Sequence, residues 1–289
     1  MSSTISIGPR GQQILWMLFN HGPLLPTTLR AVIEPMMSKR KLNIAIARLR
    51  KLGLVRNRHS STPKSSQRYI ELTQKEPAKD VLVKVLKVSE DELKRIPGST
   101  EALEHWQECV IWAKHFKTIF PNAQVFHDFQ MWRSDKIREM LKIDKNEEIH
   151  TYPDLLIAFE CNVGNYCTIA IEVERTQKSG SRIIRKLRGL AIASEIDGVL
   201  YICRGTHVAD NVKRIYRTHV LPHAHRVERY ADQFLLISDG SVDRDLGTIR
   251  TFDLKGSGIN LVCWSMNLRR KKDDERAVKS SCMGAKHAP

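Results

Sequence analysis

No stretch of this sequence approaches the length of apolar residues that a membrane-spanning helix requires. Residues 1–8 contain no basic segment leading into an apolar run, as a secretory signal would. The six cysteines form no CxxC pair, and most lie inside apolar runs such as 201–203 and 261–264. These absences predict a soluble, cytoplasmic protein with buried thiols, and they argue against zinc and disulfides.

The net charge of +15 is spread unevenly over the 289 residues. Residues 1–75 contain 13 Lys or Arg against 2 Asp or Glu, and residues 265–289 contain 7 against 3. Residues 76–264 contain 27 of each sign and are neutral. A basic end on a neutral body is typical of a protein that binds a polyanion, so double-stranded DNA is the expected partner.

Residues 1–75 are predicted to form a winged helix-turn-helix domain. Helical spacing of apolar residues favours helices over 9–20 and 27–33, and Ser38 can cap a third helix that ends at Leu52. Strands over 54–56 and 68–73 then flank a polar loop, and the run "LRKLGLVR…RYIELT" resembles the recognition helix and wing of many bacterial winged-helix proteins. The third helix of such a domain enters the major groove, and its wing contacts the backbone. The expected DNA contacts are Lys39, Arg40, Asn43 and Arg50 on the helix and Arg56, Arg58 and Lys64 on the wing. A winged helix that contacts protein, with solvated basic residues, is the alternative.

Residues 76–99 are predicted to be a helical linker with a capping box at 89–92. Residues 100–266 are predicted to form an α/β domain with a mixed sheet. Its expected elements are a helix over 100–120, strands over 124–129, 155–159, 168–174 and 198–203, a basic helix over 181–193, and further strands over 234–238 and 248–264. Residues 267–289 are predicted to be a disordered basic tail that adds nonspecific DNA affinity.

Three acids fall at the ends of a predicted β-hairpin. Asp154 begins one strand, while Glu172 and Glu174 end the next and share a face because they are two residues apart. Carboxylates that converge there raise the free energy of the folded chain unless their charge is neutralised. Mg²⁺ (or Mn²⁺) prefers such oxygen ligands. Asp154 and Glu172 would hold the ion, with Glu174 as ligand or general base, and the ion would activate water for attack on a phosphodiester.

The pattern Pro153-Asp154…Glu172-Val173-Glu174 resembles the PD-(D/E)xK nuclease core, with Glu174 at the position where lysine is usual. The resemblance implies a restriction-endonuclease-like fold and metal-dependent cleavage of DNA. Some restriction enzymes of this fold are similar in having glutamate there, but the departure also favours a domain that does not cut. Lys178, four residues on, is a candidate replacement for the lysine.

The longer runs "MWRSDKIR", "YPDLLI" and "AIEVERTQKS…RKLRGL" resemble the plasmid replication-relaxation family and its MobC-type relaxases, over roughly residues 10–220. The resemblance implies a winged helix joined to a nuclease core, with Asp135 in the position of a further family acid. It also implies nicking or relaxing of bacterial plasmid DNA during mobilisation, together with other mobilisation proteins and without a tyrosine nucleophile. The sequence does not decide the oligomeric state, so a monomer and a homodimer are both compatible with it.

Other candidates rank below these acids. Glu104 and Glu108 are one turn apart on the 100–120 helix, where an acid often joins the metal site in nucleases of this fold; a solvated helix face is the equal alternative. The expected phosphate contacts beside the metal are Arg175, Lys178, Arg182, Arg185 and Lys186, although these too fit a solvated helix. His219, His223 and His225 are similar to the metal motif of tyrosine relaxases, but Pro222 breaks the strand that such a motif needs, so a polar loop is predicted.

Two functions from different classes therefore compete. The favoured one is a metal-dependent DNA endonuclease or relaxase that binds and nicks DNA. The alternative is a DNA-binding regulator or replication accessory protein whose nuclease-like domain does not cut. The missing lysine of the motif is the best support for the alternative.

Overall fold

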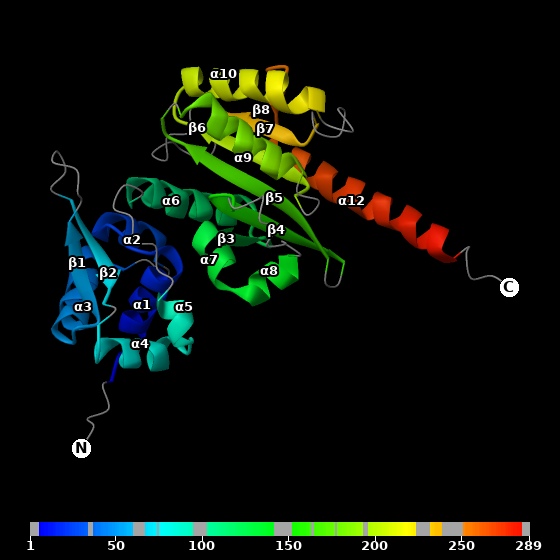
Figure 1. Cartoon of the computed structure of the whole chain (residues 1–289). Helices are drawn as coiled ribbons and strands as arrows, with labels where there is room; N and C mark the ends of the chain where they lie inside the picture. The colour runs from blue at the N-terminus through cyan, green and yellow to red at the C-terminus, as the bar shows by residue number, and fades with distance from the viewer. Residues whose placement is uncertain are drawn as a thin grey trace. The chain divides into compact units, whose positions relative to one another are not determined.

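The computed structural model describes residues 6–33, 37–59, 67–73, 75–94, 103–141, 152–162, 165–176, 178–192, 196–223, 232–238 and 251–284 (Figure 1). The protein is mixed α/β with a mixed sheet, and it divides into two compact units. Unit 1 comprises Met1–Lys114 and Trp132–Ser134, and unit 2 comprises His115–Met131 and Asp135–Pro289. Among the described residues, no helix is both long enough and apolar enough to cross a membrane.

Unit 1 begins with three helices and a hairpin, in the order that the sequence predicts. These elements are α1 (Pro9–His21), α2 (Pro26–Val32), α3 (Lys39–Lys51), β1 (Val55–His59) and β2 (Arg68–Leu72). The Ser38 Oγ accepts a hydrogen bond from the Lys41 N–H at 3.3 Å, so the predicted cap of α3 is confirmed. The two strands are antiparallel, with Val55 opposite Leu72 and His59 opposite Arg68.

The core of unit 1 follows from the spacing of its apolar residues. Leu42, Ile46 and Leu49 lie one helical turn apart on α3 and are buried. Ile14 and Leu18 form the matching face of α1. Because α3 buries this one face only, its opposite face, which carries most of its basic residues, is left to solvent.

The predicted linker is part of unit 1. It forms α4 (Ala78–Leu86) and α5 (Glu90–Lys94). Ala78, Leu82 and Leu86, spaced four residues apart, all join the core of unit 1, so α4 packs against the helices before it. The predicted capping box is confirmed: the Ser89 N–H donates to Glu92 Oε2 at 2.8 Å, and the Glu92 N–H donates to Ser89 Oγ at 3.1 Å.

The boundary between the units falls inside α6 (Leu103–Ile119), not before it. Buried Gln107 explains why the start of α6 belongs to unit 1. Its Nε2 donates to the Pro23 carbonyl at 2.9 Å, and its Oε1 accepts from the Leu25 N–H at 2.9 Å. A buried amide that is satisfied by distant backbone groups is stabilising, and one left without them is costly.

Unit 2 is built on a seven-stranded sheet in the order β3-β4-β5-β6-β7-β8-β9. The pairs β5–β6 and β6–β7 are parallel, and the others are antiparallel. The strands are β3 (Gln124–His127), β4 (Leu155–Asn162), β5 (Asn165–Glu174), β6 (Gly198–Cys203), β7 (Phe234–Ile237), β8 (Thr251–Phe252) and β9 (Gly258–Ile259). The helices are α7 (Asp128–Arg133), α8 (Asp135–Leu141), α9 (Gly180–Ile192), α10 (Thr206–Ile215) and α12 (Leu261–Gly284), with α7 crossing the unit boundary.

Helices cover both faces of the central strands. Ile183 and Leu187 of α9 and Val212 of α10 pack on the face that carries Ala170 and Tyr201. The opposite face contacts α12, and Phe120, directly after α6, meets Phe159 edge to face at 5.1 Å between ring centroids. β6 and β7 are buried throughout, as expected of strands covered on both sides.

The disordered tail predicted from residue 267 is wrong as far as Gly284, because these residues continue α12. Trp264 and Leu268 are buried on the sheet, and Lys272 forms an ion pair with Asp197, which also accepts a hydrogen bond from the Thr168 N–H at 2.8 Å. These anchors hold the first three turns of α12.

The strands predicted over 248–264 are only partly present, because α12 begins at Leu261. In the first turn of α12, Trp264 is buried on the sheet, so the preceding residue lies on the outer side of the helix. Cys263 is therefore exposed, contrary to prediction, whereas Cys109, Cys167 and Cys203 are buried as expected.

The polar loop predicted around the histidines is also wrong. α10 continues into a π-helical turn, η1 (Tyr216–Val220), and a 3₁₀ turn, η2 (Leu221–His223). Tyr216 stacks on Phe234 at 4.1 Å between ring centroids, and this packing keeps the segment helical. His219 and His223 are exposed on these turns, and His225 lies outside the described residues.

We predict that Gly198→Ala destabilises unit 2 by about 1–3 kcal/mol, because a Cβ at this position overpacks the contact with α12. It would lie 2.6 Å from Leu268 Cδ1 and 2.7 Å from Trp264 Cη2. Urea unfolding followed by circular dichroism measures the effect. The matched control is Gly258→Ala, whose added Cβ meets nothing within 4 Å. Equal unfolding midpoints for the two variants would show that α12 is not packed on β6 in this way.

Candidate functional site

The hairpin β4–β5 brings the three predicted acids together. Its register places Leu155 opposite Ile171, so Asp154, one residue before β4, lies at the carboxyl end of β5. The Val173 N–H donates to Asp154 Oδ2 at 2.8 Å and fixes that carboxylate. Glu172 and Glu174 flank Val173 and share the face of β5 that α9 covers.

Both glutamates are buried. Glu172 is 3% exposed and Glu174 is 4% exposed. Burial raises the pKa of Glu172 well above its ordinary value, and the charge of Asp154 acts in the same direction. Burial also raises the pKa of Glu174. The site therefore holds carboxyl groups in surroundings that disfavour their charge.

Lys186 of α9 is the countercharge that the sequence did not reveal. Its Nζ lies 3.5 Å from Asp154 Oδ1 and forms a close ion pair with Glu172 Oε2, and its side chain is only 17% exposed. Burial lowers the pKa of Lys186, but the two acids raise it by more, so the net shift is upward and the ammonium stays charged. The prediction placed Lys186 among phosphate contacts on an open helix face; the structure places it with the acids.

The position of Lys186 on α9 explains this difference. The face of α9 that packs on the sheet carries Ile183, Leu187 and Leu190. At 100° per residue, Lys186 lies beside this face, next to Leu190. Its aliphatic stem can therefore run toward the sheet while its ammonium reaches the carboxylates.

A second lysine completes the charge pairing. Lys178 Nζ lies 2.9 Å from Glu174 Oε2. The lysine that the sequence suggested as a replacement thus contacts one acid, while Lys186 contacts the other two. Arg182 and Arg185 are exposed on α9, which is compatible both with phosphate contacts and with a solvated helix face.

Two carboxylate oxygens of the cluster are not satisfied by these lysines. Within the described part of the chain, the Oε1 atoms of Glu172 and Glu174 are buried and have no hydrogen-bond partner. A buried oxygen without a partner is costly, and a hard cation with oxygen ligands removes that cost. The side chains present therefore fit Mg²⁺ or Mn²⁺.

The remaining predicted acids lie elsewhere. Asp135 is the first residue of α8; its side chain is 68% exposed and forms an ion pair with Arg138, three residues along the helix. Glu104 and Glu108 belong to unit 1, where Glu104 is exposed and Glu108 is buried. The structure gathers partly buried Asp154 and buried Glu172 and Glu174 into one cluster and leaves Asp135 at the surface.

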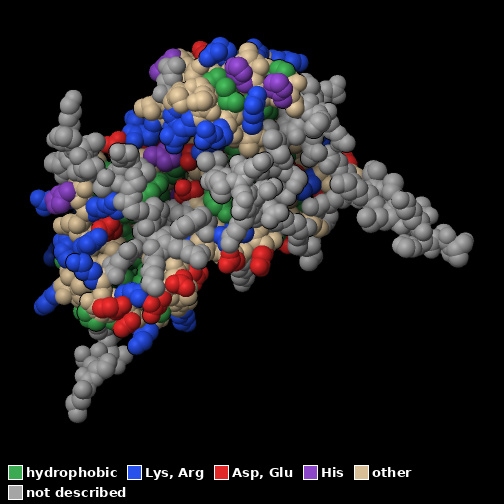
Figure 2. Space-filling view, viewed as in Figure 1, with side chains coloured by type: hydrophobic (Ala, Val, Ile, Leu, Met, Phe, Trp, Pro, Cys, Tyr) green, Lys and Arg blue, Asp and Glu red, His purple; other side chains and the backbone are tan. Residues whose placement is uncertain are grey.

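The basic surface of unit 1 lies where it was predicted. Figure 2 shows Lys and Arg side chains over α3 and β1. The helix residues expected to contact DNA are all exposed: Lys39, Arg40, Asn43 and Arg50. On the hairpin, buried Glu71 of β2 pairs with Arg56 of β1 at 2.7 Å and with Arg58 of β1 at 3.2 Å. Lys64 lies outside the described residues.

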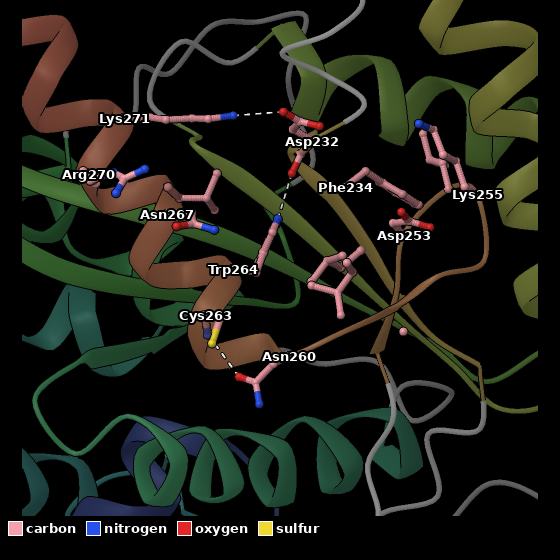
Figure 3. A pocket seen from close by; sticks show the side chains of 15 residues that line it. Asp232, Phe234, Asp253, Lys255, Asn260, Cys263, Trp264, Asn267, Arg270 and Lys271 are labelled. Atoms are coloured by element: carbon pink, nitrogen blue, oxygen red, sulfur yellow. Dashed lines mark hydrogen bonds and ion pairs between the residues drawn. The ribbon is translucent and has the colours of Figure 1, made fainter.

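Unit 2 also has a cavity of about 830 Å³ between α12 and the strands β7 to β9 (Figure 3). Phe234, Trp264, Asn267 and Arg270 are among its lining residues. The Trp264 Nε1–H donates to the Asp232 carbonyl at 2.8 Å and ties α12 to the end of the sheet. The residues that line the cavity do not include those of the acid cluster.

We predict that the pH dependence of stability reports the buried Glu172. Its pKa in the folded chain is raised above the ordinary value of 4.5, so its contribution to stability is full below pH 4.5 and is lost as the pH rises through the folded pKa. Glu172→Gln removes this loss. The unfolding free energy of this variant relative to the wild type should therefore increase as the pH is raised above 4.5, as measured by urea unfolding in EDTA.

The matched control is Glu160→Gln, which changes an exposed acid on β4. Its difference from the wild type should stay nearly constant over the same pH range. A Glu172→Gln curve that runs parallel to the wild type would contradict the burial of that carboxylate.

Comparison of the chain with protein-family models, with curated proteins and with solved structures finds no match. The assignment of a function therefore depends on the side chains that the fold brings together.

Proposed function

We propose that this protein is a metal-dependent DNA endonuclease that binds and nicks DNA. In this proposal, unit 1 is a winged helix-turn-helix domain that binds the duplex, and unit 2 is a nuclease domain of the PD-(D/E)xK type. The observation that carries the proposal is the position of Lys186 against Asp154 and Glu172. It supplies, from α9, the ammonium that the motif lacks at Glu174.

Each residue of the cluster has a role that its surroundings support. Asp154 and Glu172 would hold Mg²⁺ or Mn²⁺, which when bound supplies a Lewis acid and lowers the pKa of water. Glu174 can take a proton from the attacking water, because burial raises its pKa and so makes its carboxylate a stronger base. Lys186 can donate hydrogen bonds to the negative charge that develops on the phosphate. Lys178 orients Glu174 through their 2.9 Å ion pair.

The charge of unit 1 supports a duplex as the substrate. α3 presents a basic outward face, and residues 1–75 carry most of the net positive charge of the chain. Exposed Arg182 and Arg185 on α9 add positive charge beside the cluster in unit 2. The resemblance to plasmid replication-relaxation proteins extends the proposal to plasmid mobilisation in a bacterial cytoplasm, in company with other mobilisation proteins.

We predict that the protein nicks supercoiled plasmid carrying its own locus in Mg²⁺ or Mn²⁺, and that Asp154→Asn lowers the rate by about 100-fold or more. Lys186→Met should lower the rate to a similar extent, because it removes the charge that stabilises the phosphate. Conversion of supercoiled DNA to open circles measures the rate, and DNA binding with a thermal melt checks that each variant is folded. Linear product would indicate a double-strand nuclease.

The matched control is Lys84→Met, which removes an exposed lysine from α4 and should leave the rate unchanged. Nicking that persists in folded Asp154→Asn would refute the assigned site. Absence of cleavage with either metal, while DNA binding is retained, would establish the alternative, a DNA-binding regulator or replication accessory protein.

We also predict that Arg40→Ala weakens DNA binding and lowers the slope of log affinity against log salt by about one, because one phosphate contact is lost. Fluorescence anisotropy at several salt concentrations measures this slope. Lys84→Ala, in the same unit but on α4, should leave it unchanged. An unchanged slope for Arg40→Ala would exclude that residue from the DNA interface.

A further inference from the structure

The outward face of α3 has an apolar centre. Ile44 is 60% exposed, and it and Met266 are the most exposed large apolar side chains in the described part of the chain. Ala47, also exposed, lies one turn further on. At 100° per residue, both lie on the line that joins Arg40 to Lys51, directly opposite the buried Leu49 side.

Polar groups surround this apolar centre and are partly fixed. The Arg50 Nη2 donates to Asn57 Oδ1 on β1 at 2.7 Å, and the Arg48 Nη2 donates to the Ser6 carbonyl at 3.3 Å. These two arginines are thereby drawn toward the edges of the face. Asn43 is exposed on the same face and is adjacent to Ile44 in the chain.

We infer that α3 recognises an A·T base pair in the major groove, with Ile44 against the thymine methyl group. Only thymine presents a methyl group in that groove, and the side-chain amide of asparagine matches the edge of adenine. Asn43 can therefore contact adenine while Ile44 contacts its partner, and the small Ala47 lets the helix approach closely. This inference rests on the proposed DNA binding by unit 1.

A single exposed isoleucine is common on protein surfaces and has no meaning by itself. Ile44 differs from such isolated surface residues in its position. It stands in the middle of a strongly basic helix face, where isoleucine is a poorer helix former than alanine or lysine. A face that bound only phosphates would gain nothing from an apolar centre, whereas a face that reads bases does.

The test couples the protein side chain to the DNA methyl group. A duplex is selected from a random pool with the full chain in EDTA, and each thymine is then replaced by deoxyuridine, which lacks only that methyl. One such replacement should weaken wild-type binding by about threefold to tenfold. Ile44→Ala should bind the thymine duplex that much more weakly and lose nothing further with deoxyuridine, whereas Ile44→Val should keep most of the difference.

Two controls separate this effect from others. Met266→Ala, which removes an equally exposed apolar side chain from α12, should change neither affinity. Arg40→Ala should weaken binding to both duplexes equally. Because Ile44 is exposed on a helix, its replacement by alanine should not unfold unit 1.

The outcomes distinguish this inference from the proposed function. If the full chain selects and binds no duplex, DNA binding and the inference fail together. If it binds but no thymine is sensitive to deoxyuridine, or if Ile44→Ala keeps the sensitivity, the inference is overturned while the proposed function stands.

Discussion

The arrangement of unit 2 depends on two buried glutamates at the carboxyl end of a central strand. Glu172 and Glu174 cannot stay charged in that position unless a cation reaches them. The topology dictates where the cation comes from. β5 and β6 are parallel, so the chain between them must cross a face of the sheet, and α9 makes that crossing on the face where the glutamates point. Lys186 is thus placed by the connection itself, and the acids and the helix stabilise one another.

A buried carboxylate also has its countercharge nearby in the hairpin β1–β2 of unit 1. Glu71 is buried and lies directly opposite Arg56 across the hairpin, with Arg58 two residues away on the same strand. Its carboxylate contacts both arginines, so part of the positive charge on β1 is compensated within the protein. The count of basic residues in 1–75 therefore overstates the uncompensated positive charge on β1. Under the proposed function, α3, whose Arg40 and Lys51 flank an apolar centre, contributes more to DNA recognition than Arg56 and Arg58 do.

The sequence predicted those features that depend on neighbouring residues. The cap at Ser38, the alternation that puts Glu172 and Glu174 on one face, and the helices and central strands all follow from local spacing. The sequence did not predict features that are determined by packing between residues far apart in the chain. The assignment of α4 to unit 1 depends on how its apolar face meets α1, far earlier in the chain, and Gln107 is held by backbone groups that no sequence pattern reveals. α12 begins within an apolar run and continues into a polar segment, and its burial depends on the space above Gly198. In the sequence, Lys186 is one of several basic residues in the helix α9, because its contact with Asp154 forms only in the folded chain.

Under the proposed function, the charge balance of the cluster accounts for Glu174 at the position where the PD-(D/E)xK motif has lysine. Asp154, Glu172 and Glu174 carry three formal negative charges, and Lys178 and Lys186 carry two positive ones. A lysine in place of Glu174 would bring a third ammonium into the group and leave fewer oxygens for a metal. With glutamate there, the group has one negative charge in excess and two buried oxygens without a partner. A divalent cation would reverse the excess to one positive charge, which matches the single negative charge of a phosphodiester. Under the proposed function, moving the ammonium from β5 to α9 therefore keeps the charge of the motif while adding a third carboxylate to the site.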